Sequence, residues 1–216
     1  MSWTWNALLA KWLPSQERRQ LATLFPGVVA SDVQAALNLL LDLSGQLAAG
    51  GTQLSADARL IIWQGVPLAL PYRLYVREPL AGNLQELSNR QRQLVHCLYL
   101  RHHDGYVRQR HLEALFTLSD GAPEAFTTPF TFSLLGEYVQ EILQVLEQCL
   151  TPMLLASYVQ LIAENPLYWQ QTRGRVASYW DVYYRIRKRG APRFRHYVGA
   201  RILARLDHAC QVARLS

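Results

Sequence analysis

Histidines and an aspartate that could bind a metal ion gather in one stretch of the sequence. They are His96, His102, His103, Asp104 and His111. A metal site needs its ligands within about 2.0–2.2 Å of one ion. On one helix, His96 and His103 would be about 10.5 Å apart at about 1.5 Å per residue, which is too far for a shared ion. We therefore predict a helix C-terminus whose histidines interact with the helix dipole, followed by a helix that Asp104 caps.

A pair of carboxylates is the second candidate for chemistry. Glu137 and Glu141 are spaced so that they would share one face of a helix. Paired carboxylates can perform acid–base chemistry or bind a metal. The alternatives are a solvated acidic edge and an edge that contacts the basic C-terminal helices. No histidine or second acidic pair opposes them, so we favour a non-catalytic role.

Positive charge is concentrated at the C-terminus. The chain of 216 residues has a net charge of +6, whereas residues 151–216 hold eleven cations and three acids, a net charge of +8. Tyrosine and tryptophan alternate with these cations, as in nucleic-acid grooves where cations neutralise phosphates and rings stack on bases. The side chains that could bind a partner or nucleic acid are Arg173, Arg175, Arg185, Arg187, Lys188, Arg189, Arg193, Arg195, Arg201 and Arg205.

The same basic residues also suit roles other than nucleic-acid binding. An aromatic stripe at helical spacing is typical of a core, arginine stems cover apolar surface, and cations complement helix C-termini. An acidic protein partner or an anionic membrane surface also suits such a cluster. Near the N-terminus, Trp3, Trp5 and Trp12 could anchor a partner, although packing onto the domain itself is the interpretation we favour.

The common catalytic and cofactor motifs are absent from the sequence. It contains no phosphate-binding P-loop, dinucleotide fingerprint, zinc-protease motif, nucleophile elbow or calcium-binding loop. We therefore expect no enzyme activity and no cofactor or metal.

Cys97, Cys149 and Cys210 are widely spaced and form no paired motif, which predicts free thiols in a reducing cytoplasm. We also expect no signal peptide and no transmembrane segment, because the apolar runs fall short of about 18 residues.

Apolar periodicity defines the elements that would position these residues. An N-terminal unit, residues 1–86, should contain helices over 3–13, 15–25 and 31–43 and a small β-hairpin within 59–76, turning at 65–67. A C-terminal unit, residues 87–216, should pack with it as one body. Its helices are predicted at about 89–103, 106–117, 129–150, 152–163, 166–188 and 197–213.

Paired helices joined by tight turns are typical of α-solenoids. The segment from Asp104 to Arg108 resembles the start of the second helix of a HEAT-type repeat, and the resemblance covers about residues 87–117. It implies that Asp104 caps that helix, that Val107 packs in the core, and that Arg108 ties neighbouring repeats together. A fainter match at 136–139 lacks the arginine. His111 stands where a small residue is usual, and the chain has no regular period.

The sequence therefore predicts a mainly α fold, a short HEAT-like repeat stack with a small β-hairpin in its N-terminal third. The function that it favours is a non-enzymatic module that binds another protein through its helical surface. The alternative is nucleic-acid binding by the C-terminal arginines and aromatics. A third hypothesis is an enzyme of unrecognised type, centred on the 102–104 turn or on the two glutamates at 137 and 141.

Overall fold

The predicted mainly helical fold with one small hairpin is confirmed. The computed structural model describes residues 16–42, 57–76, 78–79, 81–186, 190 and 193–215. Its α-helices are α2 (Gln16–Ala22), α3 (Ala30–Asp42), α4 (Ala81–Gln85), α5 (Asn89–Tyr99), α6 (Gly105–Leu118), α7 (Thr128–Ser133), α8 (Gln140–Gln148), α9 (Pro152–Glu164), α10 (Pro166–Tyr179) and α11 (Val198–Leu215). The helix predicted over 3–13, with Trp3, Trp5 and Trp12, lies outside the described residues.

Shorter turns of helix and one antiparallel hairpin complete the described chain. The 3-10 turns are η1 (Ala125–Thr127), η2 (Leu134–Gly136) and η4 (Phe194–His196), and a π-helical segment, η3 (Trp180–Arg185), extends α10. The hairpin strands are β1 (Ala58–Trp63) and β2 (Val66–Pro71).

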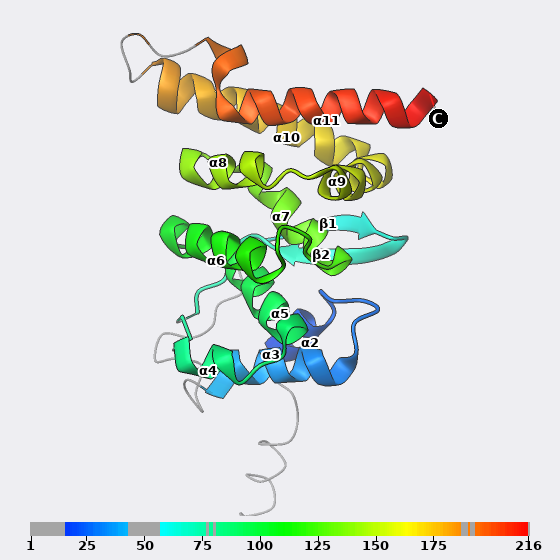
Figure 1. Ribbon diagram of the computed structural model, residues 1–216, viewed down its shortest axis with the longest axis vertical. Coiled ribbons are helices and arrows are strands. Elements are labelled where there is room, and N and C mark those ends of the chain that lie inside the picture. The colour runs from blue at the N-terminus through cyan, green and yellow to red at the C-terminus, as the bar shows by residue number, and fades with distance from the viewer. Residues whose placement is uncertain are drawn as a thin grey trace, which may run out of the picture.

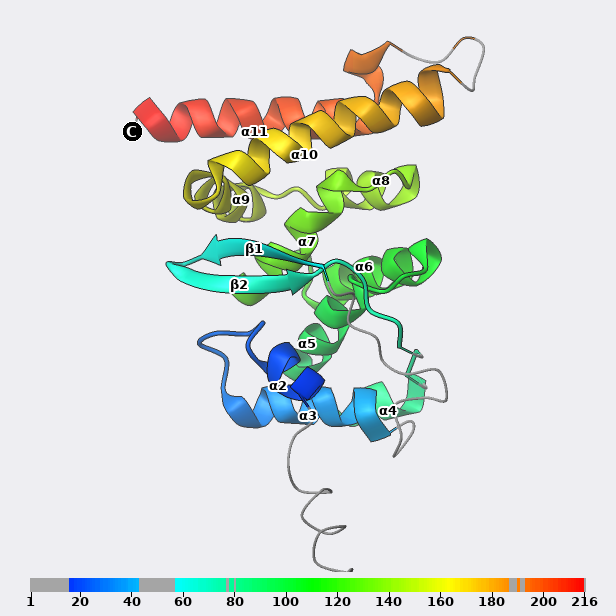
Figure 2. The ribbon, with the colours of Figure 1, turned by 180° about the vertical axis from the view of Figure 1, so that it is seen from behind.

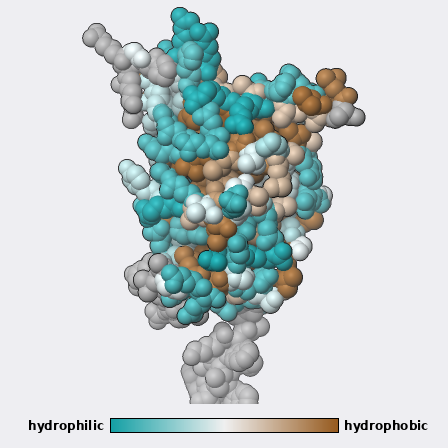
Figure 3. All heavy atoms as spheres, in the orientation of Figure 1, coloured by the Kyte–Doolittle hydropathy of each residue, from teal (hydrophilic) through white to brown (hydrophobic). Residues whose placement is uncertain are grey.

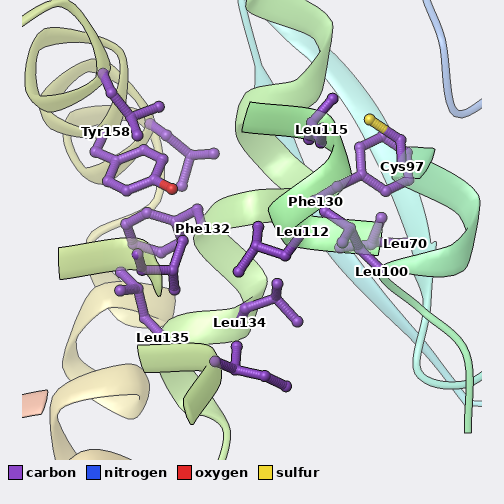
Figure 4. Close-up of a cluster of buried hydrophobic side chains, with 14 of the residues drawn as sticks. Leu70, Cys97, Leu100, Leu112, Leu115, Phe130, Phe132, Leu134, Leu135 and Tyr158 are labelled. Atoms are coloured by element: carbon purple, nitrogen blue, oxygen red, sulfur yellow. The ribbon is translucent and has the colours of Figure 1, made fainter. Parts of the chain in front are cut away.

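The elements are stacked along the long axis of the molecule. Figures 1 and 2 place α2, α3 and α4 at one end, followed by α5, then α6 level with the hairpin, then α8 and α9, with α10 and α11 at the other end. Buried apolar side chains form a connected core from Leu21 in α2 to Leu206 in α11. In its centre, Phe132 of α7 packs edge-on against Tyr158 of α9, with ring centroids 5.3 Å apart (Figure 4).

The α5–α6 pair has the caps that its sequence predicts. Ser88 Oγ accepts a hydrogen bond from the backbone nitrogen of Gln91, and Gln91 Oε1 accepts one from the backbone nitrogen of Ser88, so α5 begins with a capping box. Asp104 accepts from the Tyr106 backbone nitrogen at 2.8 Å, which confirms it as the N-cap of α6. The helix predicted over 89–103 ends at Tyr99, because the backbone that follows it pairs with Leu74 after the hairpin.

One predicted helix is wrong. Residues 129–150 do not form a continuous helix, because α7 passes into η2 and the chain then becomes extended at Glu137 before α8 begins. Glycine has a low helix propensity, and Gly136 lies at this break. The extended backbone turns the Glu137 side chain into the core, where it is 4% exposed. Its buried ionic contacts, described below, replace the helical hydrogen bonds that a continuous helix would have made.

The hairpin turns one residue earlier than predicted. Gln64 and Gly65 both have positive φ, 51° and 75°, as a two-residue type I′ turn requires. Trp63 pairs with Val66, so Val66 and Pro67 belong to β2 rather than to the turn. The inner face is buried through Ile61, Trp63, Leu68 and Leu70, whereas the alternate residues Ala58, Leu60, Ile62, Pro67 and Ala69 are exposed.

The described helices include no single one with the length and hydropathy to cross a membrane. Helices α8 and α9 meet that test only as a pair, and the chain bends by 116° between them.

Cys97, Cys149 and Cys210 are free thiols, as predicted. Cys97 is buried, which raises its pKa, while the other two are half-buried.

Two helical glycines should respond to alanine in opposite directions. At Gly199 in α11, a Cβ would lie 2.7 Å from Tyr197 Cε1 and 2.8 Å from Val176 Cγ1, so Gly199→Ala should lower the free energy of unfolding by about 1–3 kcal/mol. Gly174 in α10 has no such neighbour within 4 Å, so Gly174→Ala should raise it by about 0.5–1 kcal/mol. Urea unfolding measures both, and effects of the same sign would contradict this packing of α10 against α11.

Candidate functional site

Arginines line a cleft between the hairpin and the start of α10, which we call the arginine cleft. Its volume is about 600 Å³, and it is lined by Asp57, Ala58, Arg59, Leu60, Tyr72, Leu167, Tyr168, Gln171 and Arg175. Arg59, Tyr72, Tyr168 and Arg175 also line a narrower cavity, together with Leu70, Arg73, Arg101, Ser133, Gly136 and Glu137. The two spaces therefore form an open outer cleft and a confined inner end.

Hydrogen bonds hold β1 against the start of α10. The Asn165 side-chain amide accepts from the backbone nitrogen of Ile62 at 2.7 Å and donates to its carbonyl at 2.6 Å. Arg59 Nη1 donates to Gln171 Oε1 at 2.5 Å. The Arg59 guanidinium carbon lies 4.7 Å from the ring centroid of Tyr168, within the range of a cation–π contact. Neutral groups therefore hold Arg59, and its positive charge stays uncompensated by these contacts.

Arg175 of α10 is a second arginine in the lining of the cleft. Its side chain is half-buried and passes beside Gly136, whose ideal Cβ position lies 3.5 Å from Arg175 Cδ. Across the part of the chain that the structure describes, no hydrogen bond or ion pair involves Arg175. A half-buried guanidinium with donors free is suited to bind an anion in a fork geometry.

At the inner end, Glu137 is bound by two arginines. Its Oε2 accepts from Arg108 Nη2 at 3.0 Å, and its Oε1 lies 3.1 Å from Arg73 Nη2. Arg108 is 1% exposed and also donates to the carbonyls of His102 and His103, at 2.7 and 2.9 Å. Burial lowers the pKa of Arg108, and Glu137 opposes that shift. Arg108 thus ties the turn between α5 and α6 to the segment that precedes α8.

Arg101 is a further buried cation beside the inner end. It donates to the carbonyls of Pro71 and Tyr72, at 2.8 and 2.5 Å, and to Ser133 Oγ at 2.8 Å. Burial, and secondarily the charge of Arg73, lowers the pKa of Arg101 to about 10, so it remains charged at neutral pH. Five arginines, at positions 59, 73, 101, 108 and 175, therefore surround two carboxylates, at 57 and 137.

The C-terminal arginines predicted from the sequence are dispersed, and several bind other parts of the protein. Arg201 makes a two-pronged ion pair with Glu147, and Arg205 donates to the carbonyls of Glu147 and Leu150, so both join α11 to α8. Arg185 pairs with Asp181 within η3. Arg173 lies 3.5 Å from Asp207. Arg193 and Arg195 are exposed, Arg175 lines the cleft, and Arg187, Lys188 and Arg189 lie outside the described residues.

The hypothesis that two glutamates share a helix face is wrong. Glu137 lies in the extended segment and is buried against two cations, whereas Glu141 lies exposed in the first turn of α8. The cleft arginines at 59, 73 and 101 were not predicted from the sequence, because they belong to parts of the chain without excess positive charge. The one signal available was an arginine inside the apolar run of β1, at position 59.

Two of the clustered histidines contact each other in the core. His96 Nδ1 lies 2.9 Å from His111 Nδ1, and Glu78 Oε1 lies 3.4 Å from His111 Nε2. Burial lowers the pKa of His96 to about 4 and that of His111 to about 3, with neighbouring cations adding to both shifts. Both rings are therefore neutral at pH 7. In the described ranges, no group of three or more His, Cys, Asp or Glu side chains is arranged to hold a metal.

Compared with known proteins, the chain matches no family model, no curated protein and no solved structure. Its chemistry therefore has to be argued from the arrangement of its own residues. The positive charge around the cleft attracts anions. Exposed apolar side chains lie on the outer face of the hairpin.

Removing the Glu137 charge should destabilise the protein strongly. Glu137→Gln leaves Arg108 buried without its carboxylate, so we expect the free energy of unfolding to fall by about 3–5 kcal/mol. The matched control is Glu124→Gln, because Glu124 pairs with Arg90 at the surface. That change should cost less than about 1 kcal/mol. Urea unfolding compares the two variants. Equal losses in the free energy of unfolding would show that the buried ion pairs of Glu137 stabilise the fold no more than a surface ion pair does.

Stability should fall as the pH drops from about 6.5 towards 4. The folded-state pKa values of His96 and His111 lie below the ordinary value, so the unfolded chain binds protons first. Each proton contributes a slope of about 1.4 kcal/mol per pH unit. Thermal melts between pH 7.5 and 4.5 should show a shallower slope for His111→Gln. The same substitution at His208, which is exposed, should leave the slope unchanged. An equal change in slope for the His208 variant would show that the buried histidines are not the cause of the pH dependence.

Proposed function

We propose that the chain is a non-enzymatic protein-binding module. The observation that carries the proposal is the outer face of the hairpin. Its residues Ala58, Leu60, Ile62, Pro67 and Ala69 are all apolar and exposed, and Leu60 is 73% exposed. An isolated exposed leucine needs no explanation, but neighbouring apolar residues on one sheet face are typical of an interaction surface.

Features of the helices support the same proposal. Figure 3 shows apolar side chains gathered in the upper half of one face, with hydrophilic ones around them. Asp104 caps α6, Val107 is buried, and Arg108 joins the turn before α6 to the segment before α8. A stack of paired helices provides a rigid support for such a surface.

The charge near the hairpin defines the partner more closely. Arg59 of β1 belongs to the inner side of the hairpin and Arg73 follows β2, so cations lie close to the hairpin without being part of its apolar outer face. Complementary charge at the edge of an interface favours encounter with the correct partner. We therefore propose a protein partner whose apolar contact surface is bordered by acidic side chains.

Nucleic-acid binding by the C-terminal arginines is the alternative. Exposed Arg193 and Arg195 favour it. Its support is weaker because Arg201 and Arg205 are engaged with α8. The affinity for nucleic acid would fall steeply as the salt concentration rises, and this dependence distinguishes nucleic-acid binding from protein binding through an apolar surface.

A pull-down from nuclease-treated native lysate tests the proposal. The unsubstituted chain should retain one stoichiometric protein partner, and the double variant Ile62→Lys/Ala69→Lys should lose it, because lysine places charge on the apolar face. The matched control is Val212→Lys, an exposed apolar position on α11, which should retain the partner. Retention by the hairpin variant would overturn the proposed surface. Loss of every partner on nuclease treatment would favour the nucleic-acid alternative.

A further inference from the structure

We propose that the arginine cleft binds the phosphate group of a small organic phosphate. This inference does not rest on the proposed protein partner, because it concerns a different ligand and different binding groups, although Ala58 and Leu60 of the hairpin's outer face also line the cleft. It is carried by the number of guanidinium groups around the cleft, by the contacts that leave two of them uncompensated, and by the dimensions of the space between them.

The charges around the cleft do not cancel. Glu137 is shared by Arg73 and Arg108, so its single negative charge offsets only one of their two positive charges. Asp57, at the outer end, is the other carboxylate in the lining. Arg59 and Arg175 have no ion pair with either of them among the contacts of the described chain, and Arg101 is bound by carbonyls and a hydroxyl. A dianionic ligand would compensate this excess, and in a partly desolvated cleft the attraction is stronger than in water.

The positions of the two uncompensated arginines favour a tetrahedral anion. Arg59 lies on β1 and Arg175 on α10, and both line the outer cleft and its inner end. Figure 2 shows β1 lying beneath the start of α10, so the two arginines approach the cleft from different elements. Guanidinium groups bind phosphate through paired N–H donors, and a phosphate has oxygens for more than one such group. Each arginine can therefore bind a separate edge of the same phosphate.

The outer cleft has room for more than an inorganic anion. Its volume of about 600 Å³ lies within the range of about 300–1,000 Å³ that is usual for small-molecule sites. Leu60, Leu167 and the Tyr72 ring supply apolar and aromatic surface near the mouth. The phosphate would then lie between the arginines, and the organic part would contact these side chains.

Isothermal titration calorimetry with adenosine monophosphate, adenosine and inorganic phosphate tests the proposal on the full chain. Adenosine monophosphate should bind, adenosine should not, and inorganic phosphate should bind at least tenfold more weakly than the nucleotide. No detectable binding of the nucleotide, or equal binding of adenosine, would overturn the proposal. Equal affinity for inorganic phosphate would overturn the claim that the cleft also binds the organic portion of the ligand. A single-stranded oligonucleotide that binds where the monophosphate does not would replace it with nucleic-acid binding.

Two arginines on α10 supply the matched variants. Arg175→Gln should weaken nucleotide binding at least tenfold, because it removes a cleft cation that has no other partner in the described chain. Arg173→Gln removes an exposed cation that contacts Asp207 outside the cleft, so its affinity should stay within twofold. Unchanged melting temperatures without ligand establish that both variants fold. Equal affinities of the two variants would contradict the site.

The hairpin variants separate this site from the protein-binding surface. Ile62→Lys/Ala69→Lys changes side chains outside the cleft lining, so nucleotide binding should survive in a protein that has lost its partner. Conversely, Arg175→Gln should retain the protein partner. Either proposal can therefore fail while the other holds.

Discussion

The buried contact of Glu137 with Arg108 and Arg73 is the constraint on which the arrangement of the other elements depends. Three parts of the chain meet there: the first turn of α6, the segment after β2, and the extended residues before α8. A buried charge is costly unless it is paired and hydrogen-bonded, so none of these parts can move without exposing an unpaired ion. The two carbonyls that Arg108 binds add the turn between α5 and α6 to the same unit.

This constraint also explains why the arginine cleft is positively charged. Because Glu137 is committed to Arg73 and Arg108, it is not available to Arg175, which passes beside the neighbouring Gly136. Arg101 is held by backbone carbonyls instead of a carboxylate. Arg59 and Arg101 are thus held by neutral acceptors, which fix the positions of these two cations without cancelling their charge. Such an arrangement favours binding of an anion, and the described lining offers no nucleophile paired with a base.

Local patterns in the sequence predicted the elements better than they predicted the site. Helical periodicity gave correct starts for α5, α9 and α10. Ser88 and Thr151 cap the first two helices, and Pro166 stands in the first turn of the third. The break before α8 was not predicted, because the spacing of Leu134, Leu135 and Ile142 fits one apolar helix face whether or not the helix is continuous. Gly136 is the one local signal of the break, and the long-range pairing of Glu137 with Arg108 fixes the extended segment that follows it.

Charge counting did not locate the arginine cleft for a related reason. It identified the C-terminal segment by composition, but a cleft is assembled from elements that are distant in sequence, here β1, the chain after β2, the end of α5, and α10. Arg175 is the one cleft residue that composition also highlighted. By contrast, Arg201 and Arg205 have acceptors on α8, so much of the apparent positive surface is used inside the fold. The acceptors of Arg108, Glu137 and the carbonyls of His102 and His103, could not be identified without the fold.

The hairpin connects the two surfaces that we propose, and its rigidity comes from the helices. A two-stranded hairpin alone is marginally stable in water. Here Trp63 and Leu68 are buried on its inner face, and Asn165 satisfies the outer edge of β1 at Ile62. Arg101 fixes the carbonyls at the end of β2. The apolar outer face is therefore held in a fixed position although it contributes no burial of its own, and the same elements hold Arg59 in the lining of the cleft.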